Sequence, residues 1–317
     1  MTSLRIGTRG SPLALWQSGR IRESLIQGGS PAELVRIETA GDLDRDTPLG
    51  RFGRPAIFSR ELDEALLDRR IDLAVHSLKD LPTELPEGIV LAAVGAREDV
   101  RDALVGRGPL RWADLPREGT IATSSLRRQA QILRARPDLR VADLRGNVGT
   151  RLDQLDATPD WTAVLLAAAG LVRLGLADRI GERLPLELML PAPGQAALAV
   201  TARADDAAST LARAAVNVTT VELAVVAERA LLHILEGGCH VPVAAFATFE
   251  PEAPELLLRA RVLSLDGRQS VEGSMRDRVE DSARAASLGE RLARRLIDEG
   301  ARRILHSAGE RAPGNRG

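Results

Sequence analysis

The first candidate for chemistry is Cys239, the single cysteine among 317 residues. A lone thiol forms no disulfide within the chain. Apolar residues at helical spacing predict a helix over 219–235, and Gly237 and Gly238 predict that this helix ends just before the cysteine. A free cysteine is most often a small buried hydrophobe. The alternative is a thiol that carries a covalent group, which the room left by the two glycines favours.

The second candidate is the pair Lys79 and Asp80. Lys79 is the only lysine among 43 basic residues, and a compact ammonium with an adjustable pKa can do work that arginine cannot. A buried strand is predicted over 71–75, so the segment HSLKDLP lies where open α/β sheets bind ligands, beyond the carboxyl ends of their strands. Asp80 is therefore a candidate site carboxylate, with a surface turn or helix cap as the alternative. His76 is interpreted as a structural histidine.

Arginines gather at the starts of predicted helices. Arg9 and Ser11 lie in the turn between a strand over 4–8 and the next helix, a common place for an anion. Four more arginines occupy helix starts within one predicted domain: Arg127, Arg128, Arg145 and Arg151. A positive charge there opposes the helix dipole, which favours a bound anion over arginines that only face solvent. Because arginine pairs bidentately with carboxylates, we expect a ligand with many carboxylates.

The composition narrows the class of protein. The chain has 44% hydrophobic and 27% charged residues and a net charge of −1, so no global positive charge is available to hold nucleic acid. The sequence has no G-x-x-x-x-G-K motif and no G-x-G-x-x-G motif after a strand, which disfavours a nucleotide ligand. We expect no export signal, no membrane span and, with one cysteine, a reducing cytoplasmic location.

Strands and helices alternate along the first two thirds of the chain, which predicts α/β domains with parallel or mixed sheets. A charged stretch at 98–102 and a Pro/Gly-rich stretch at 191–195 are expected to be crossings between domains. The predicted domains are 1–97 with 196–216, then 98–195, then 217–317. The last is expected to be a small α+β domain with strands near 241–248, 255–262 and 269–272. A loop is expected over 40–55 and a frayed tail from Ser307.

At this point the sequence resembles the porphobilinogen deaminase family of tetrapyrrole biosynthesis. Eight segments in order carry the resemblance: TRGSPLALWQ (8–17), AVHSLKDLP (74–82), REDVRDAL (97–104), TSSLRRQAQ (123–131), LRGNVGTRL (144–152), AAAGLVRLGL (167–176), PAPGQAALA (191–199) and LEGGCHVPV (235–243). The resemblance implies two domains similar to type II periplasmic binding proteins plus a small third domain. It also implies stepwise condensation of four porphobilinogen units with loss of ammonia, release of hydroxymethylbilane, and a monomer without metal.

The resemblance further implies a dipyrromethane cofactor held by a thioether to Cys239, and roles for particular residues. Asp80 and Lys79 are the implied catalytic residues. The implied cofactor contacts are Ser11, Lys79, Asp80, Thr123, Ser124, Ser125, Arg127, Arg128, Arg145 and Gly146. The implied substrate contacts are Arg9, Ser11, Phe58, Arg145, Arg151, Arg173 and Gln195. The expected partner is porphobilinogen, with neither nucleic acid nor membrane.

Two departures from the family pattern stand out. Many members have a glycine-lysine-glycine run where this chain has Arg54, Pro55 and Ala56, and Ala196 follows Gln195 where glycine is usual. The first leaves one basic contact open, for which Arg51 and Arg60 are candidates. Three other functions are weighed: a binding module for a carboxylated ligand, a Schiff-base lyase using Lys79, and, least favoured, a cysteine hydrolase.

Overall fold

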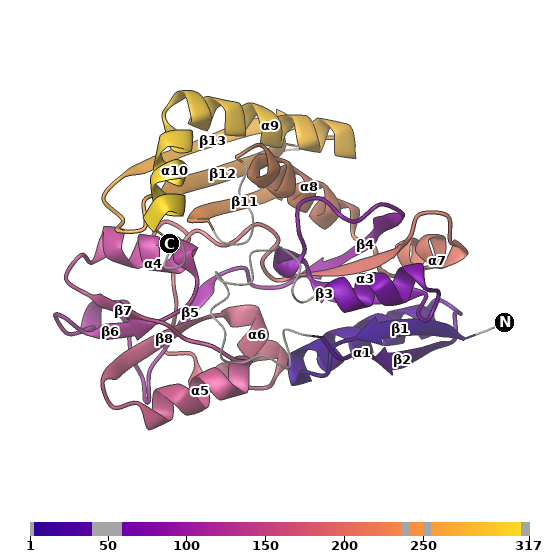
Figure 1. Cartoon of the computed structure of the whole chain (residues 1–317), viewed down its shortest axis with the longest axis horizontal. Coiled ribbons are helices and arrows are strands. Elements are labelled where there is room, and N and C mark those ends of the chain that lie inside the picture. The colour runs from indigo at the N-terminus through magenta and orange to yellow at the C-terminus, as the bar shows by residue number, and fades with distance from the viewer. Residues whose placement is uncertain (1–2, 40–58, 236–240, 250–254, 312–317) are drawn as a thin grey trace.

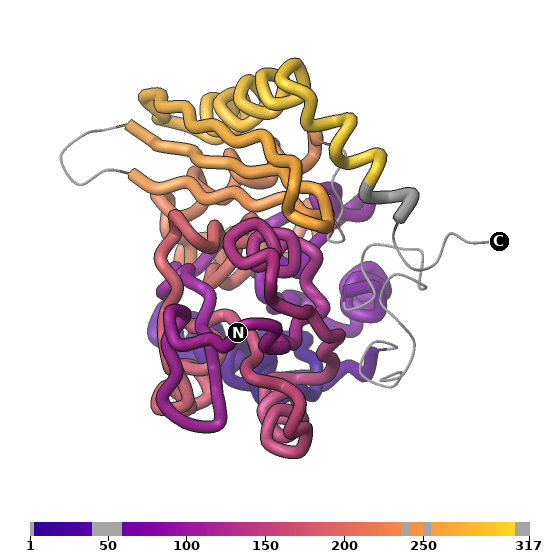
Figure 2. Tube along the Cα trace, turned by 90° about the vertical axis from the view of Figure 1, so that its left-hand side faces the viewer, coloured from indigo at the N-terminus to yellow at the C-terminus, as the bar shows by residue number. Residues whose placement is uncertain are grey.

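Three β-sheets and the helices packed on them form the fold (Figure 1). The computed structural model describes residues 3–39, 59–235, 241–249 and 255–311. Two of the sheets have five strands each and the third has three. In Figure 2 the sheet of the C-terminal third stands apart from the other two.

The first sheet has the order β2(Ala32–Arg36), β1(Leu4–Thr8), β3(Leu73–Ser77), β10(Ala197–Arg203), β4(Ile89–Arg97). Strands β1, β2 and β3 are parallel, whereas β10 runs antiparallel to both β3 and β4. Helices α1(Pro12–Gln27) and α7(Ala207–Val216) pack with Ile6 and Val200 on one face of the sheet. Helix α3(Arg60–Leu67) packs with Ala74 on the other face.

The second sheet repeats this plan. Its order is β7(Arg140–Ala142), β6(Thr120–Ala122), β8(Trp161–Ala167), β5(Asp102–Val105), β9(Glu182–Arg183), and β5 is the strand that runs antiparallel to its neighbours. Helix α4(Leu126–Ala135) packs on one face through Ile132. Helices α5(Val148–Ala157) and α6(Ala168–Arg173) pack on the other. Both sheets are therefore mixed and share one strand order, second-first-third followed by an antiparallel strand and an edge strand.

The third sheet is an antiparallel meander of β11(Val243–Phe249), β12(Glu255–Leu263) and β13(Ser270–Arg278). Helices α8(Thr219–Ile234) and α9(Ser282–Asp298) form an apolar core with it, and α10(Ala301–Arg311) follows. The two long helices touch closely at Gly289, where a Cβ would lie 2.2 Å from the Ala227 carbonyl oxygen. A side chain at position 289 would therefore push α9 away from α8.

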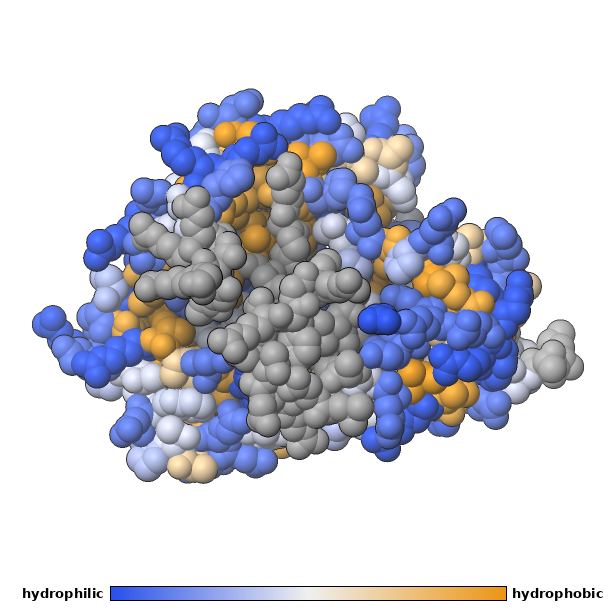
Figure 3. Space-filling model, viewed as in Figure 1, coloured by the Kyte–Doolittle hydropathy of each residue, from blue (hydrophilic) through white to orange (hydrophobic). Residues whose placement is uncertain are grey.

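Two interfaces attach this C-terminal unit. Val225 of α8 joins an apolar cluster with Leu78 and Val94 of the first unit. Against the second unit the contact is polar: Glu272 of β13 lies between Arg134 of α4 and Arg261 of β12. Around the residues drawn in grey, Figure 3 shows a largely polar surface with separate apolar patches.

The predicted architecture of two mixed α/β sheets with a small α+β unit is confirmed. Two details of the prediction are wrong. Strand β13 is longer than the expected 269–272, because its alternate residues face solvent and leave only a weak apolar signal. The chain beyond Ser307 was expected to be frayed, whereas α10 continues to Arg311. The predicted domain limits stay predictions.

No single helix of the described part is long and apolar enough to cross a membrane; α7 and α8 meet the criterion only as a pair, and the pair is bent by 111°. Within the same residues, no three or more His, Cys, Asp or Glu side chains are grouped so as to hold a metal ion.

Candidate functional site

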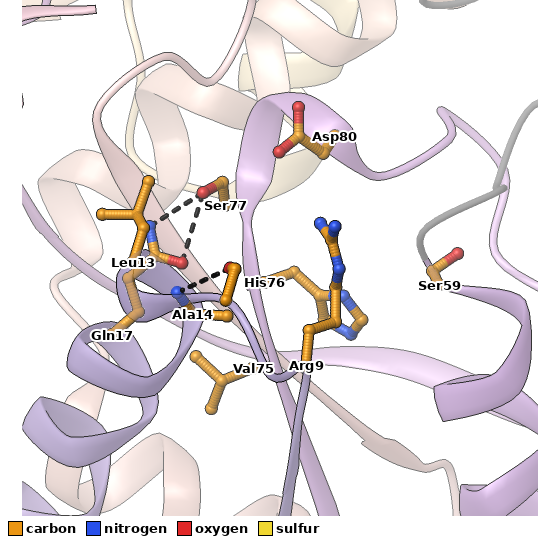
Figure 4. A pocket seen from close by; sticks show the side chains of 10 residues that line it. Arg9, Leu13, Ala14, Gln17, Ser59, Val75, His76, Ser77 and Asp80 are labelled. Atoms are coloured by element: carbon orange, nitrogen blue, oxygen red, sulfur yellow. Dashed lines mark hydrogen bonds between the residues drawn. The ribbon is translucent and has the colours of Figure 1, made fainter. Parts of the chain in front are cut away.

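A cavity opens beside the carboxyl ends of β1 and β3, as expected for an α/β sheet. It encloses about 450 Å³, counting the part open to solvent. Its polar lining comes from the turn before α1, from α1 itself, from the residue before α3 and from the end of β3: Arg9, Ser11, Gln17, Ser59, His76, Ser77 and Asp80. In Figure 4, Arg9 and Asp80 extend into this space from opposite sides.

Asp80 ends the short 3₁₀ turn Leu78–Asp80 that directly follows β3. Leu78 is buried beneath this turn, while Asp80 is exposed to the cavity. Among the described residues that line the cavity, Asp80 is the one carboxylate. The predicted place of this segment, beyond a strand end, is confirmed.

The floor of the cavity is held by neutral hydrogen bonds. The Nε2 atom of His76 lies 3.1 Å from the Thr201 hydroxyl on β10, and the Gln17 amide donates to the Ser77 hydroxyl at 2.8 Å. Burial and the nearby Arg9 charge lower the pKa of His76 to about 4. His76 is therefore neutral at physiological pH, in agreement with its interpretation as a structural residue.

Ser11 begins α1, and its side-chain oxygen accepts a hydrogen bond from the Ala14 backbone N–H at 3.3 Å. This capping bond uses an acceptor of the hydroxyl and leaves its proton for a ligand. Arg9 lies two residues earlier in the same turn, so a donor and a cation lie together before the helix. The sequence predicted this arrangement, and the structure places both residues at the cavity.

The second unit contributes Arg127 and Arg128 at the start of α4. Both side chains are buried and bind Asp102, the first residue of β5, which has no exposed surface. The two arginines hold the pKa of Asp102 well below its usual range. The sequence analysis predicted an anion beside the arginines at the start of this helix. For Arg127 and Arg128 that anion is a carboxylate of the protein itself, so the position of these two arginines alone does not require a ligand.

The turns around these arginines are built by hydroxyl groups. Thr123 accepts a hydrogen bond from the Ser125 N–H at 3.2 Å, and Ser125 in turn caps α4. Ser124 donates to the Leu144 carbonyl and accepts from the Leu144 N–H, so it joins the turn after β6 to the turn after β7. These predicted cofactor contacts therefore lie together at the adjacent ends of β6 and β7.

The turn after β7 presents Arg145, Gly146 and Arg151. Gly146 has a φ of +98°, which suits glycine, and its carbonyl accepts a hydrogen bond from the Arg151 Nε at 2.8 Å. Arg145 contacts Asp143 at 3.3 Å. Burial, followed by the charge of Arg128, lowers the pKa of Arg151 to about 10.

Lys79 connects the two halves of the site. It is half-buried, and its Nζ lies 3.4 Å from the Gln195 side-chain oxygen. Burial lowers its pKa to about 8; Asp80 opposes that shift, and Arg128 adds to it. The charges of Asp80 and Arg128 also shift the pKa of Arg151. Charges from the two units therefore lie within electrostatic reach of one another.

Gln195 lies in the crossing at 191–196, and Arg173, the last residue of α6, contacts residues of both crossings. Arg173 is 6% exposed; it contacts Glu98 at 2.9 Å, donates to the Ala196 carbonyl at 2.7 Å, and lies over the Trp16 ring. Gln195 is fully buried. The structure therefore places these two predicted substrate contacts at the crossings rather than in the lining of the described cavity.

Several predicted features lie outside the described residues: Phe58, Cys239 with its two preceding glycines, and the departure at 54–56. Asp102, in contrast, is a functional candidate that the sequence reasoning missed. A usable signal was present, because a carboxylate that opens a strand as apolar as Asp102–Val105 needs a buried cationic partner.

The residues present suit a ligand with several carboxylates. Burial is the main cause of the lowered pKa values of Lys79 and Arg151, and the charge of Arg128 lowers both further. Guanidinium and ammonium groups with hydroxyl donors are the set that binds carboxylates. The fold and the site define an α/β protein with two similarly built units and a group of cations whose chemistry suits a polycarboxylate.

Comparison with known proteins narrows this class to one family. A family model described as "Porphobilinogen deaminase, dipyromethane cofactor binding domain" matches residues 4–210, and the model of the C-terminal domain of the same protein matches residues 222–298. The chain belongs to the porphobilinogen deaminase family, which consists of transferases of tetrapyrrole biosynthesis that carry a dipyrromethane cofactor. This membership sets aside the binding-module, lyase and hydrolase alternatives.

Individual relatives agree with the family assignment. Porphobilinogen deaminase from Geotalea uraniireducens is 45% identical over 307 residues, which cover 96% of this chain and 94% of the relative. The enzyme of the same name from Geobacter metallireducens is 47% identical over 304 residues, covering 95% and 93%. Among solved structures, a periplasmic substrate-binding protein of an ABC transporter from Coxiella burnetii aligns with a TM-score of 0.44 and 14% identity, covering 67% of this chain and 91% of that protein.

Proposed function

We propose that this chain condenses porphobilinogen units, with Asp80 as the carboxylate at the reacting centre. The observation that carries the assignment is the place of Asp80: it is exposed to the cavity at the end of β3 and lies within electrostatic reach of Lys79 and Arg151. The dipyrromethane, attached through Cys239, would supply the pyrrole carbon to which the first unit is joined.

The role of Asp80 follows from the chemistry of the substrate. When the ammonium group of an aminomethylpyrrole leaves as ammonia, the pyrrole keeps a positive charge, and that charge lasts until a new carbon–carbon bond forms and a ring proton is lost. A fixed carboxylate near the ring nitrogen stabilises this cation. Asp80 is suited to the task because no arginine within the described residues forms an ion pair with it.

The cations of the cleft would hold the acetate and propionate groups. Arg9 and Ser11 serve the side of the first unit, and Arg145 and Arg151 serve the side of the second. Carboxylates bound there would raise the pKa of Lys79 back toward its ordinary value, because each brings a negative charge near the ammonium. Arg127 and Arg128 share one counter-charge in Asp102 and retain a net positive charge for the cofactor.

The test is Asp80→Asn, which keeps the shape of the side chain and removes its charge. We expect an unchanged circular dichroism spectrum and a loss of ammonia release of roughly 10²–10³-fold, the usual effect of removing a preorganised electrostatic contact. Glu84→Gln, an exposed change four residues further on, serves as the control and should keep full turnover. Turnover near the wild-type rate in Asp80→Asn would refute the assignment.

The covalent attachment is tested separately by intact mass and peptide mapping. Wild-type protein should carry the mass of two linked porphobilinogen-derived rings on the peptide that contains Cys239, and Cys239→Ala should lack it. We further propose that the enzyme works as a monomer in the cytoplasm. The single cysteine supports the location, because a chain without disulfides is typical of a reducing compartment. Light scattering of the purified protein at assay concentration checks the monomer; a dimer mass would contradict it.

A further inference from the structure

Asp102 receives hydrogen bonds from three side chains at once. Arg127 donates from Nη1 to Oδ2 at 2.7 Å. Arg128 donates to Oδ1 from Nε at 3.0 Å and from Nη2 at 2.7 Å. The Gln195 amide nitrogen donates to the same Oδ1 at 3.0 Å. The carboxylate has no exposed surface. It is bonded by two predicted cofactor contacts, Arg127 and Arg128, and by Gln195 of the crossing.

Each arginine also donates a hydrogen bond to a main-chain carbonyl. Arg127 also donates to the Leu190 carbonyl at 2.7 Å, and Arg128 donates to the Leu165 carbonyl at 2.9 Å. A buried guanidinium with two bonded edges keeps one orientation, which removes the entropy cost of ordering it when a ligand arrives. Because two cations share one anion, the trio retains a net charge of about +1 that favours an anionic ligand.

Gln195 extends this network to the first unit. Its amide nitrogen donates to Asp102 and to the Val100 carbonyl at 2.8 Å. With the nitrogen used in this way, the amide oxygen points at Lys79, whose Nζ lies 3.4 Å away. Asp102 in the second unit and Lys79 in the first are thus joined through one buried amide.

We propose that Asp102 is a positioning residue for cofactor binding: it orients Arg127 and Arg128 as a single pair and, through Gln195, fixes Lys79 across the crossing between the two units. This inference rests on the proposed function, because it assumes that these cations bind the carboxylates of the dipyrromethane. Asp102 itself has no free surface with which to touch a ligand.

The competing explanation is that Asp102 only stabilises the fold. Asp72 provides the matched comparison, because it also joins two arginines: it contacts Arg5 at 2.8 Å and Arg203 at 3.4 Å. That trio lies in the first unit and includes none of the predicted cofactor contacts. If both carboxylates only stabilise the fold, both variants should lose stability, Asp102→Asn more because Asp102 is the more buried, and neither should change cofactor loading of the folded protein.

The sole lysine gives the test a readout that does not depend on turnover. In protein labelled with ¹⁵N-lysine, the side-chain signal comes from Lys79 alone. NMR spectra recorded against pH therefore give the titration midpoint of the Lys79 ammonium. The groups that shift Lys79 are Asp80 and Asp102, which raise its pKa, and Arg127 and Arg128, which lower it. Removing the charge of Asp102 should therefore lower the midpoint, whereas Asp72→Asn should leave it in place.

The second readout is cofactor loading. Apo-protein incubated with porphobilinogen is followed by intact mass, and we expect Asp102→Asn to need a roughly tenfold higher porphobilinogen concentration for half-loading, the size of one lost bond to a charged group. Asp72→Asn should load as the wild type does. A wild-type midpoint and wild-type loading in Asp102→Asn would overturn the proposal, and so would equal shifts in the two variants.

Gln195→Leu keeps the proposal testable if Asp102→Asn does not fold. It breaks the link to Lys79 while the ion pairs of Asp102 remain, and it should also lower the Lys79 midpoint because the ammonium loses an acceptor. An unchanged midpoint there would refute the connection through Gln195. Wild-type protein that gains no two-ring mass would instead overturn the proposed function, and the lysine titration would still decide the role of Asp102.

Discussion

Replacement of Glu228 by glutamine should weaken the attachment of the C-terminal unit to the rest of the enzyme. Glu228 lies on α8 with no exposed surface, and Arg97 of β4 binds it through both terminal nitrogens, at 2.7 and 3.0 Å. The same carboxylate accepts the backbone N–H of Gly194 at 2.6 Å and that of Ala247 at 2.7 Å. One side chain thus joins β4, the crossing at 191–196 and β11.

The cost follows from these four bonds. An amide at position 228 keeps one acceptor oxygen and turns the other atom into a donor, which then faces a backbone N–H and a guanidinium. Breaking a buried ion pair on one side costs about 3–5 kcal/mol. At roughly 2 °C per kcal/mol for a chain of this length, the melting temperature should fall by about 6–10 °C.

Differential scanning calorimetry of Glu228→Gln measures this, with Glu222→Gln on the same helix as the control. Glu222 is also largely buried and accepts bonds from Arg213 and Asn217, but the Arg213 side chain is 52% exposed, so that variant should lose about 1–2 kcal/mol, less than Glu228→Gln. If Glu228→Gln melts no earlier than Glu222→Gln, the buried carboxylate is not what fastens the C-terminal unit, and the reasoning from its four bonds is refuted.

Two further changes are expected to act on stability in different ways. In the wild type, the folded protein keeps His76 neutral down to a pKa of about 4, whereas the unfolded chain takes up a proton on this histidine as pH falls from about 6.5. The free energy of unfolding of the wild type should therefore fall by up to about 3 kcal/mol by pH 4. His76→Gln should lack this loss. Urea unfolding at several pH values measures this. Gly267→Val should separate the β12–β13 turn from α4, because a Cβ there would lie 2.3 Å from the Arg134 backbone nitrogen; the loss should exceed about 2 kcal/mol in a thermal melt.

Each of these two predictions has a control. His306→Gln changes an exposed histidine, so the unfolding free energy of this variant should fall with acid as it does in the wild type. If His76→Gln also falls as the wild type does, His76 is not the cause of the loss. Gly29→Ala has a comparable φ of +83° but no atom within 4 Å of the added carbon. It should cost only about 1 kcal/mol. If Gly267→Val costs no more, the close contact with α4 is unimportant.

Most strands of the two α/β units were predictable from sequence because they are short apolar runs followed by a turn. β8 and β10 are buried along most or all of their length, whereas the edge strand β9 consists of Glu182 and Arg183 and has no apolar signal. Strand β13 alternates between exposed and half-buried residues and contains Gly273 and several charges, so its apolar signal is weak. Its extent depends on pairing with β12, which the local sequence does not encode.

The site was predictable where it follows from local rules and not where it follows from tertiary contact. Asp80 after a strand and Ser11 at a helix start are local features, and the structure places both at the cavity. The partner of Arg127 and Arg128 is Asp102, which lies 25 and 26 residues away. That pairing exists because β5 inserts beside β8, with Asp102 opposite Ala167. Helix-dipole reasoning located the arginines correctly but could not identify their counter-charge.

The strand order of the first sheet has a consequence for synthesis on the ribosome. Among the strands that the structure describes, β4 pairs only with β10, and roughly 100 residues separate Arg97 from Ala197. All strands of the second sheet lie between Asp102 and Arg183, so that sheet can close first. At ~5–20 residues per second, β4 waits roughly 5–20 s for its partner. During that interval the nascent chain carries a nine-residue apolar strand with unpaired edges, which makes this the stage at which a chaperone would be most useful.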